Sequence, residues 1–500
     1  MALPRGCRAV MRRLGVPFAA IVLLAASPAP QAGPEAHAHW AVATDDAKAQ
    51  DLFDRGLAML YAFDAGEARV AFAAAAQRDP DLAMAYWGQA EADTIDINEP
   101  STREGEVRGR HAVAEGRAHL AHASPEVRAL LEAIAKRYGK GSLKERYASY
   151  ADAMSAYSKA HRDDPNVLTV SAFAIWNAED VLLDRRGAAT PKAGEMLDDL
   201  DRALVLEPAN LGAHHLRIHL LEMLRRAKDA VPDAEALDSY SYPPGESHLP
   251  HMAGHIWARV GEYDRLIDDN ERAVENDRAW FALGNGPGQQ YMKLYHDHDL
   301  DFVAYGLTTE GRNDEARAAV ATEDARMQMR VALRLHEYAR VRGIEPGKGG
   351  DVAFMHAIAA ARSGDAEGAK TEAARARKEG YADDVFLTGV LAQAQGQTET
   401  ALRDLERAYD DNKTRLGGDP KTSWELPIGE NYAVALLSAG KAAPAESVFA
   451  AELMRYPNDP RLEWGLAEAR KAQGKDDAAA RAAYRAHWKG TRDLTLADLG

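Results

Sequence analysis

Apolar side chains recur at a helical spacing along most of the chain, and small residues and prolines punctuate them with a period of about 34 residues. Counted from Ala49, positions 4, 8, 20, 24 and 32 are Leu52, Gly56, Ala68, Phe72 and Pro80. These positions match the tetratricopeptide pattern, in which small residues let two helices approach closely and the proline ends the second helix. The pattern therefore predicts a helical hairpin in this region.

The same pattern returns near the other end of the chain. Gly440, Ala445, Phe449 and Pro457 take the equivalent positions, and another turn glycine, Gly474, follows 34 residues after Gly440. Alternating apolar and polar residues, which would indicate strands, form no convincing run anywhere. The predicted fold class is all-α, a tetratricopeptide-type α-solenoid of antiparallel helix hairpins.

We expect five segments along the chain: a signal peptide over residues 1–32 with cleavage as late as residue 38, N-terminal repeats over 45–100, degenerate helical hairpins over 101–210, central histidine-rich repeats over 211–325 and C-terminal repeats over 326–490. The degenerate segment keeps the helical spacing but lacks the full set of small residues.

The first residues have the character of a secretory leader. Four arginines within residues 5–13 precede an apolar run from Leu14 to Ala26, which is too short to span a bilayer as a permanent helix. Cys7, the one cysteine of the chain, lies in this leader. We therefore expect an exported protein, periplasmic or secreted, whose mature chain has no transmembrane segment, no thiolate metal site and no cysteine nucleophile.

The formal net charge of −16 argues against a nucleic-acid partner. An acidic surface attracts metal ions and cationic partners over long range. The net charge is therefore compatible with two function classes, metal binding and protein or peptide binding.

Histidines concentrate in the middle of the chain. Residues 213–301 contain eight of the seventeen: His214, His215, His219, His248, His251, His255, His296 and His298. Several are separated by steps of three or four residues, which place imidazoles on one face of a helix.

The turn glycines Gly261 and Gly311, together with Ala230, carry the repeat numbering into this region. In the first of three consecutive units, positions 5 and 9 are His215 and His219. Positions 2, 5 and 9 are His248, His251 and His255 in the second unit, and His298, Asp301 and Tyr305 in the third. These positions span an arc of about 60° on the first helix of each unit, on the face that lines the concave groove. Neighbouring first helices lie about 10 Å apart, so we expect the side chains to converge.

Imidazole and carboxylate are ligands for transition metals such as zinc, copper or iron. The predicted metal ligands are His215, His219, His248, His251, His255, His298 and Asp301. Glu222 and Tyr305 are expected to support them, Glu222 by orienting a ligand or by acting as a general base. His214 and His296 point away from the shared face and are interpreted as structural.

Several of these stretches resemble an uncharacterised family of exported bacterial tetratricopeptide proteins with paired histidines in the central repeats. The resemblance rests on Tyr61-Ala-Phe63, His215-Leu-Arg-Ile-His219, His251-Met-Ala-Gly-His255 and His298-Asp-Leu-Asp-Phe302, among others. It implies the same fold and an exported location, and it brings no established reaction. The family pattern has a second histidine where this chain has Asp301.

Three functions are compatible with these residues. The groove holds a metal site, or it binds a protein or peptide without metal through hydrogen bonds from the histidines, or the same histidines serve an uncharacterised metalloenzyme. With no thiol and no serine–histidine motif, a metal-bound water is the natural nucleophile for the third function.

Overall fold

A computed structural model describes residues 33–94, 101–121, 123–284, 289–345, 347, 349–381, 385–413 and 424–499. Apart from two isolated β-bridges, this part of the chain contains helices and connecting turns and no strand. None of the helices within it is long and apolar enough to cross a bilayer. The expected signal peptide over residues 1–32 lies outside the described residues.

The first half of the chain contains α1 Ala47–Tyr61, α2 Ala65–Arg78, α3 Ala83–Ala92, α4 Arg103–Ala118, α5 Pro125–Arg137, α6 Leu143–Ala160, α7 Pro165–Ala178, α8 Pro191–Leu206, α9 Leu211–Met223, α10 Val231–Asp238, α11 His248–Val260 and α12 Tyr263–Ala282. The second half contains α13 Gln289–Glu310, α14 Asn313–Ala319, α15 Ala325–Arg334, α16 Tyr338–Gly343, α17 Gly350–Arg362, α18 Ala366–Lys378, α19 Val385–Ala394, α20 Thr398–Lys413, α21 Ile428–Ser438, α22 Ala442–Arg455, α23 Pro460–Ala472 and α24 Ala478–His487. Two short 3-10 helices, Ala227–Ala230 and Leu496–Asp498, complete the described elements.

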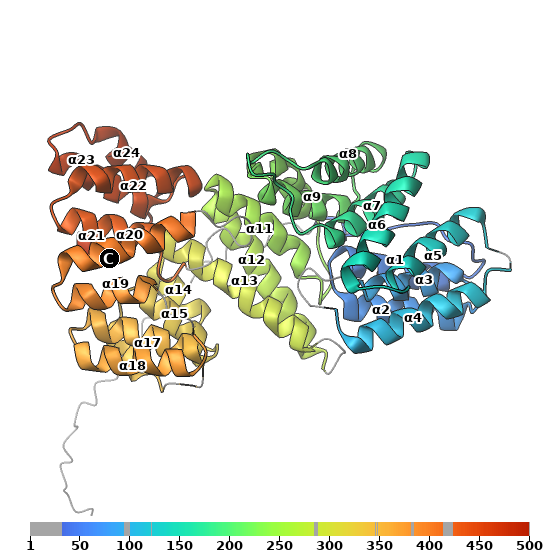
Figure 1. Cartoon of the computed structure of the whole chain (residues 1–500), viewed down its shortest axis with the longest axis horizontal. Coiled ribbons are helices and arrows are strands. Elements are labelled where there is room, and N and C mark those ends of the chain that lie inside the picture. The colour runs from blue at the N-terminus through green and yellow to red at the C-terminus, as the bar shows by residue number, and fades with distance from the viewer. Residues whose placement is uncertain are drawn as a thin grey trace, which may run out of the picture.

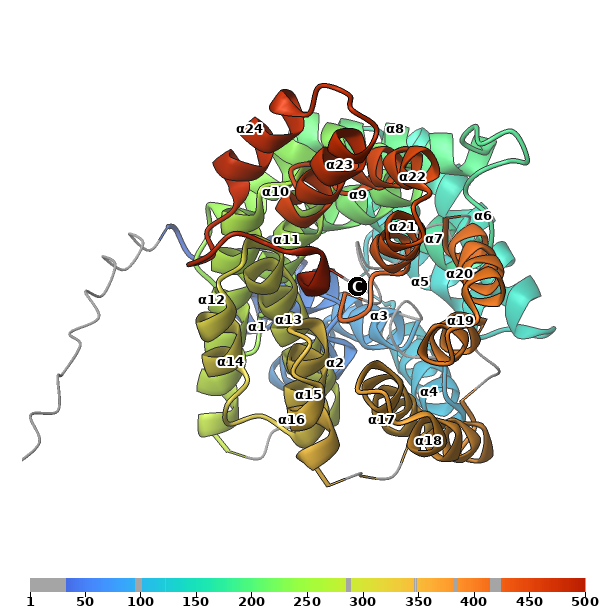
Figure 2. The same cartoon turned by 90° about the vertical axis from the view of Figure 1, so that its left-hand side faces the viewer.

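Consecutive helices pack against each other along the whole chain, from α1 at one end of the molecule to α24 at the other (Figure 1). The histidine-bearing helices α9, α11 and α13 lie between these two ends. Seen along the long axis, α11–α15 occupy one side and α17–α22 the other (Figure 2). The arrangement is the superhelical stack of an α-solenoid.

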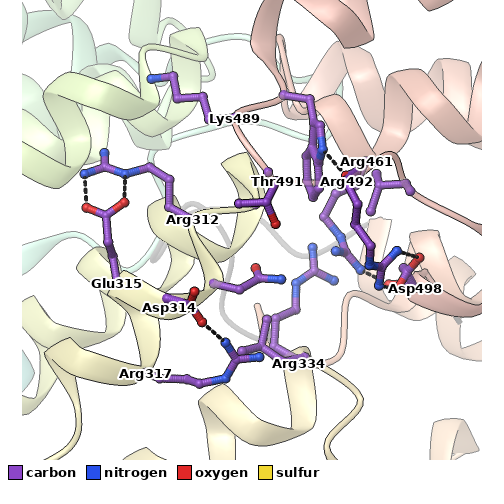
Figure 3. A pocket seen from close by; sticks show the side chains of 16 residues that line it. Arg312, Asp314, Glu315, Arg317, Arg334, Arg461, Lys489, Thr491, Arg492 and Asp498 are labelled. Carbon is purple, nitrogen blue, oxygen red and sulfur yellow. Dashed lines mark hydrogen bonds and ion pairs between the residues drawn. The ribbon is translucent and has the colours of Figure 1, made fainter. Parts of the chain in front are cut away.

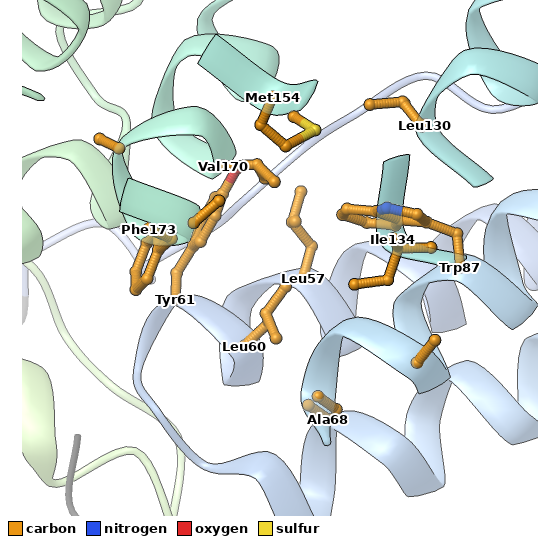
Figure 4. Packing of buried hydrophobic residues seen from close by; sticks show 14 of the residues in the cluster. Leu57, Leu60, Tyr61, Ala68, Trp87, Leu130, Ile134, Met154, Val170 and Phe173 are labelled. Carbon is orange, nitrogen blue, oxygen red and sulfur yellow. The ribbon is translucent and has the colours of Figure 1, made fainter. Parts of the chain in front are cut away.

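Phe72 explains the small residues of the N-terminal repeat. Its ring lies between Gly56 of α1 and Gly88 of α3, and a Cβ atom on either glycine would come within 2.7 Å of that ring. Nearby, Leu57 packs among Trp87 and Ile134 in the N-terminal core (Figure 4). Small residues at these positions thus let three helices close over one aromatic ring.

The C-terminal repeats use the same device. A Cβ atom on Gly465 of α23 would lie 2.3 Å from the ring of Phe449 in α22. Because both ends of the chain pack in this way and consecutive helices pair throughout, the predicted all-α solenoid is confirmed.

The C-terminal segment also folds back onto the central repeats. The backbone amide of Lys489 donates to the carbonyl of Glu310 at 2.8 Å, and Asn458 Nδ2 donates to the carbonyl of Gly261 at 3.3 Å. Residues near the end of the chain therefore brace the ends of α11 and α13, two of the three histidine-bearing helices.

Candidate metal centre

Local sequence places each histidine on its helix. Asn210 caps α9, its side-chain oxygen accepting from the amide of Ala213 at 2.9 Å. Gly261 ends α11 in the left-handed conformation, with a φ of 79° that glycine adopts without strain. Within each helix, histidines four residues apart then stack on the same face.

Six imidazoles form two groups of three. Triad A consists of His215 and His219 from α9 and His248 from α11, and triad B consists of His251 and His255 from α11 and His298 from α13. In each triad, three ring nitrogens that can bind one ion lie within 4.8 Å of one another. The convergence of the three repeat units, expected from their register, is present in the structure.

In triad A the nitrogens converge on His215. Its Nε2 lies 3.1 Å from Nε2 of His219 and 3.1 Å from Nε2 of His248. The Nδ1–H of His215 donates to the carbonyl oxygen of Tyr61 at 2.6 Å, so its Nε2 carries the lone pair. A backbone group on α1 thus fixes the tautomer of a ligand on α9.

In triad B two tautomers are fixed. The amide of Asn270 is oriented by donation from its Nδ2 to the carbonyl of Leu266, so its Oδ1 accepts from Nδ1 of His251 at 2.7 Å. Glu222 Oε2 accepts from Nδ1 of His255 at 3.0 Å. Both Nε2 atoms therefore carry lone pairs, and they face each other at 3.0 Å. Two ligands of a tetrahedral zinc ion would stand about 3.3 Å apart, so a cation fits this arrangement.

Two carboxylates stand behind triad B. Glu222 joins His255 to Arg259, whose Nε lies 2.7 Å from its second oxygen. Burial would raise the pKa of Glu222, but His255 and Arg259 hold it below its ordinary value. Asp299 is buried with Oδ1 2.9 Å from His251 Nδ1, and burial together with Asp277 raises the pKa of Asp299 well above its usual range. Glu222, which the sequence predicts as a supporting residue, thus contacts the ring nitrogen of His255 that does not face His251.

The cluster is mostly shielded from water. Four of its imidazoles are buried, and one in each triad, His219 and His298, is half-buried. Burial lowers the pKa of His215 to about 4. Burial and neighbouring imidazoles lower the pKa of His219, His248 and His251 well below the ordinary value. These rings are neutral at physiological pH, which is the form that binds metals.

An aromatic ring covers each triad. Phe63 lies 4.2, 5.6 and 5.8 Å, between ring centroids, from the three imidazoles of triad A. Phe302 lies 4.6, 4.8 and 5.1 Å from those of triad B. Phe63 holds a φ of 61° in the turn after α1, the left-handed conformation that Gly261, Gly311 and Gly440 adopt at the equivalent turns. Sequence reasoning did not identify these rings, although both belong to the stretches that carry the family resemblance.

Asp301 and Tyr305, which the sequence places with the histidines, lie outside both triads. Both carboxylate oxygens of Asp301 contact Nη1 of Arg330, and Trp424 Nε1 donates to one of them at 3.3 Å. Asp301 belongs to neither triad, because its carboxylate pairs with the guanidinium of Arg330 on α15. This pair links Asp301 to the C-terminal region. The hydroxyl of Tyr305 lies 3.4 Å from that of Tyr263, at the turn between α11 and α12.

His214 and His296 are outside the triads, as their register indicated. His214 pairs with Asp233 at 2.8 Å and with the carbonyl of Pro208 at 2.9 Å. His296 lies 3.4 Å from a carboxylate oxygen of Asp277. A third potential ligand group, His37, His39 and Asp54, stands near the start of the described chain, with both of its histidines exposed to solvent.

A cavity of about 360 Å³ lies apart from the triads, between the start of α14 and the C-terminal segment (Figure 3). Arginines crowd it, but carboxylates compensate them: Arg312 pairs with Glu315, Arg317 with Asp314, Arg334 with Glu430 and Arg492 with Asp498. Such pairing leaves little charge to attract an anion, so this cavity is not the candidate site.

Comparisons with known proteins identify no relative by sequence. No family model matches the chain, and no curated protein matches it. Among solved structures, a human IFIT1 dimer with PPP-AAAA is similar with a TM-score of 0.35 and 13% identity, over 90% of this chain and 95% of that one. Yeast Tom70 is similar with a TM-score of 0.28 and 11% identity, over 84% and 87% of the two chains. Likenesses this distant carry no inference about the site, and the fold assignment rests on the helices themselves.

Proposed function

We propose that this solenoid binds transition-metal ions, one at each histidine triad, and that it does so as an exported protein. The observation that carries the proposal is in triad B, where the lone pairs of His251 and His255 face each other at 3.0 Å with both tautomers fixed from behind. The arginine-rich leader ahead of an apolar run supports export.

A proton shared between Nε2 of His251 and Nε2 of His255 would be the simplest alternative to a metal ion. Burial opposes it, because the pKa of His251 lies well below its ordinary value, with His298 and His255 adding to the effect. A metal ion satisfies both lone pairs and gains a third nitrogen from His298. Zinc, copper and iron all accept imidazole.

Three protein ligands leave the fourth position of a tetrahedral ion open, as in catalytic zinc sites. The half-buried imidazoles His219 and His298 connect each triad to solvent. The same geometry would also suit a metalloenzyme, in which Glu222 accepts from Nδ1 of His255, orients that ring and raises its basicity.

The test is metal uptake by protein purified without a polyhistidine tag and stripped with a chelator. We expect two ions of zinc or copper per chain by elemental mass spectrometry, and one in the double variant His251→Ala/His255→Ala. His111→Ala, which removes an exposed histidine outside the triads, is the matched control and should keep both ions. Wild-type protein that takes up fewer than two ions of either metal would overturn the proposal.

Partner binding is a second candidate, favoured by a different region. A cavity of about 340 Å³ lies among α13, α15, α17 and α19, with Phe354, Tyr381 and Phe386 beside charged residues such as Arg326 and Asp351. Solenoids commonly bind peptides on such concave surfaces. Selection from a random peptide library should yield peptides whose affinity falls with Phe354→Ala and is unchanged by metal removal. Peptides that bind the variant equally well would exclude this surface.

A further inference from the structure

The two triads are built by one rule. Triad A combines positions 5 and 9 of the repeat on α9 with position 2 of the repeat on α11, and triad B applies the same rule one repeat later. Helix α11 serves both, because His248 belongs to triad A and His251, three residues on, belongs to triad B. The triads are therefore adjacent steps of one solenoid.

Distances show that the six imidazoles form one continuous cluster. Between the triads, the ring centroids of His248 and His251 are 5.8 Å apart and those of His219 and His255 are 6.4 Å apart. Within triad A, the widest of the measured separations is 6.3 Å. The separation of His248 and His251 is thus smaller than the widest separation within triad A. Ions bound at the two triads would be neighbours, and in two-metal sites the ions stand about 3.5–4 Å apart.

The ligand chemistry favours copper. All six candidate ligands are imidazoles, whereas non-haem iron sites typically include a carboxylate ligand. Among the described residues, the carboxylates that touch triad B, Glu222 and Asp299, contact Nδ1 atoms on the far side of the rings. Copper forms the most stable complexes of the divalent metals at such nitrogen sites.

We propose that triads A and B form a single dicopper centre, in which two copper ions share one oxygen-donor ligand at the positions that the histidines leave open. This inference rests on the proposed metal binding. The simplest shared ligand is hydroxide, formed when a bound water releases one proton to solvent. A shared oxygen couples the unpaired electrons of two Cu(II) ions, so that their magnetic signal disappears.

The experiment is spin counting on the full chain loaded with Cu(II) alone. We expect two copper ions per chain by elemental analysis, but an electron paramagnetic resonance signal that accounts for little of that copper. Denaturation in acid should release the ions and restore the full signal. His219→Ala in triad A and His298→Ala in triad B should each retain one copper with its full signal, because a single ion has no neighbour.

Each other outcome has a separate meaning. Two copper ions with two full spins would leave metal binding intact and overturn the shared centre. A signal that stays absent after denaturation would show that the copper was reduced, and it would also count against a coupled Cu(II) pair. Fewer than two ions in the wild type would contradict the proposed function itself.

Discussion

Triads A and B use the same positions of the repeat but differ in the groups that accept hydrogen bonds from their imidazoles and cover their rings. His215 in triad A donates to a backbone carbonyl on α1, and Phe63 from the turn after α1 covers the rings. His255 in triad B donates to the carboxylate of Glu222, and Phe302 from the helix that carries His298 covers the rings. Triad A is thus supported by neutral groups from a distant part of the chain, whereas triad B is supported by the carboxylate of Glu222 on the neighbouring helix α9.

This difference has an energetic consequence. A carboxylate that accepts from a ligand imidazole raises the basicity of the ring and offsets the charge of the ion, whereas a backbone carbonyl only orients the ring. We therefore expect triad B to bind a divalent ion more tightly than triad A. Four predictions test this comparison.

The largest effect should come from removing one ligand of each triad in turn. His255→Ala should abolish the tighter site and leave the weaker one, and His219→Ala should do the reverse. Copper titration against a competing chelator would measure the affinity that remains in each variant. Equal residual affinities would show that the carboxylates behind triad B do not distinguish the two sites.

Acid should destabilise the metal-free protein, and more through triad A than through triad B. The folded-state pKa of His215 is lowered to about 4, so its neutral form favours folding fully above pH 6.5 and progressively less as the pH falls toward 4. Over that window the loss is about 3 kcal/mol for His215. His219 and His248 share the direction of this shift. In urea unfolding at pH 7 and pH 5, His215→Gln should lose less stability than wild type. An equal loss would contradict the prediction.

Removal of the carboxylate should have a smaller effect, confined to triad B. Glu222→Gln keeps the shape of the side chain but removes its charge, and loss of such a supporting contact typically costs 10- to 100-fold in metal affinity, about 1.4–2.7 kcal/mol. Isothermal titration should show the tighter site weakened and the other unchanged. Circular dichroism would serve as the folding control, because Arg259 also loses its carboxylate partner. A parallel loss at both sites would indicate a general structural effect.

The sequence predicted the solenoid and the residues of both triads, because helix periodicity and repeat register are local properties. Positions 2, 5 and 9 of successive repeats give six convergent histidines without knowledge of how the solenoid curves. The support of triad A could not be predicted in this way. Tyr61 and His215 are 154 residues apart, and they meet only because α1 packs beside α9. Asp301 was misplaced because Arg330, on α15 beside α13, pairs with its carboxylate, and Trp424, 123 residues along the chain, also donates to it.

The smallest effect should follow Asp301→Asn, and it bears on which metal the triads bind. The pKa of Asp301 is raised to about 6, because burial outweighs the attraction of Arg330, so the ionised form contributes little to stability. Arg330 also keeps a second carboxylate, Glu425, at 3.0 Å. We therefore expect unchanged metal content by elemental analysis and a small change in thermal stability. Loss of an ion would instead place this carboxylate among the ligands, and a mixed set of histidine and carboxylate would favour iron over the copper pair that six imidazoles imply.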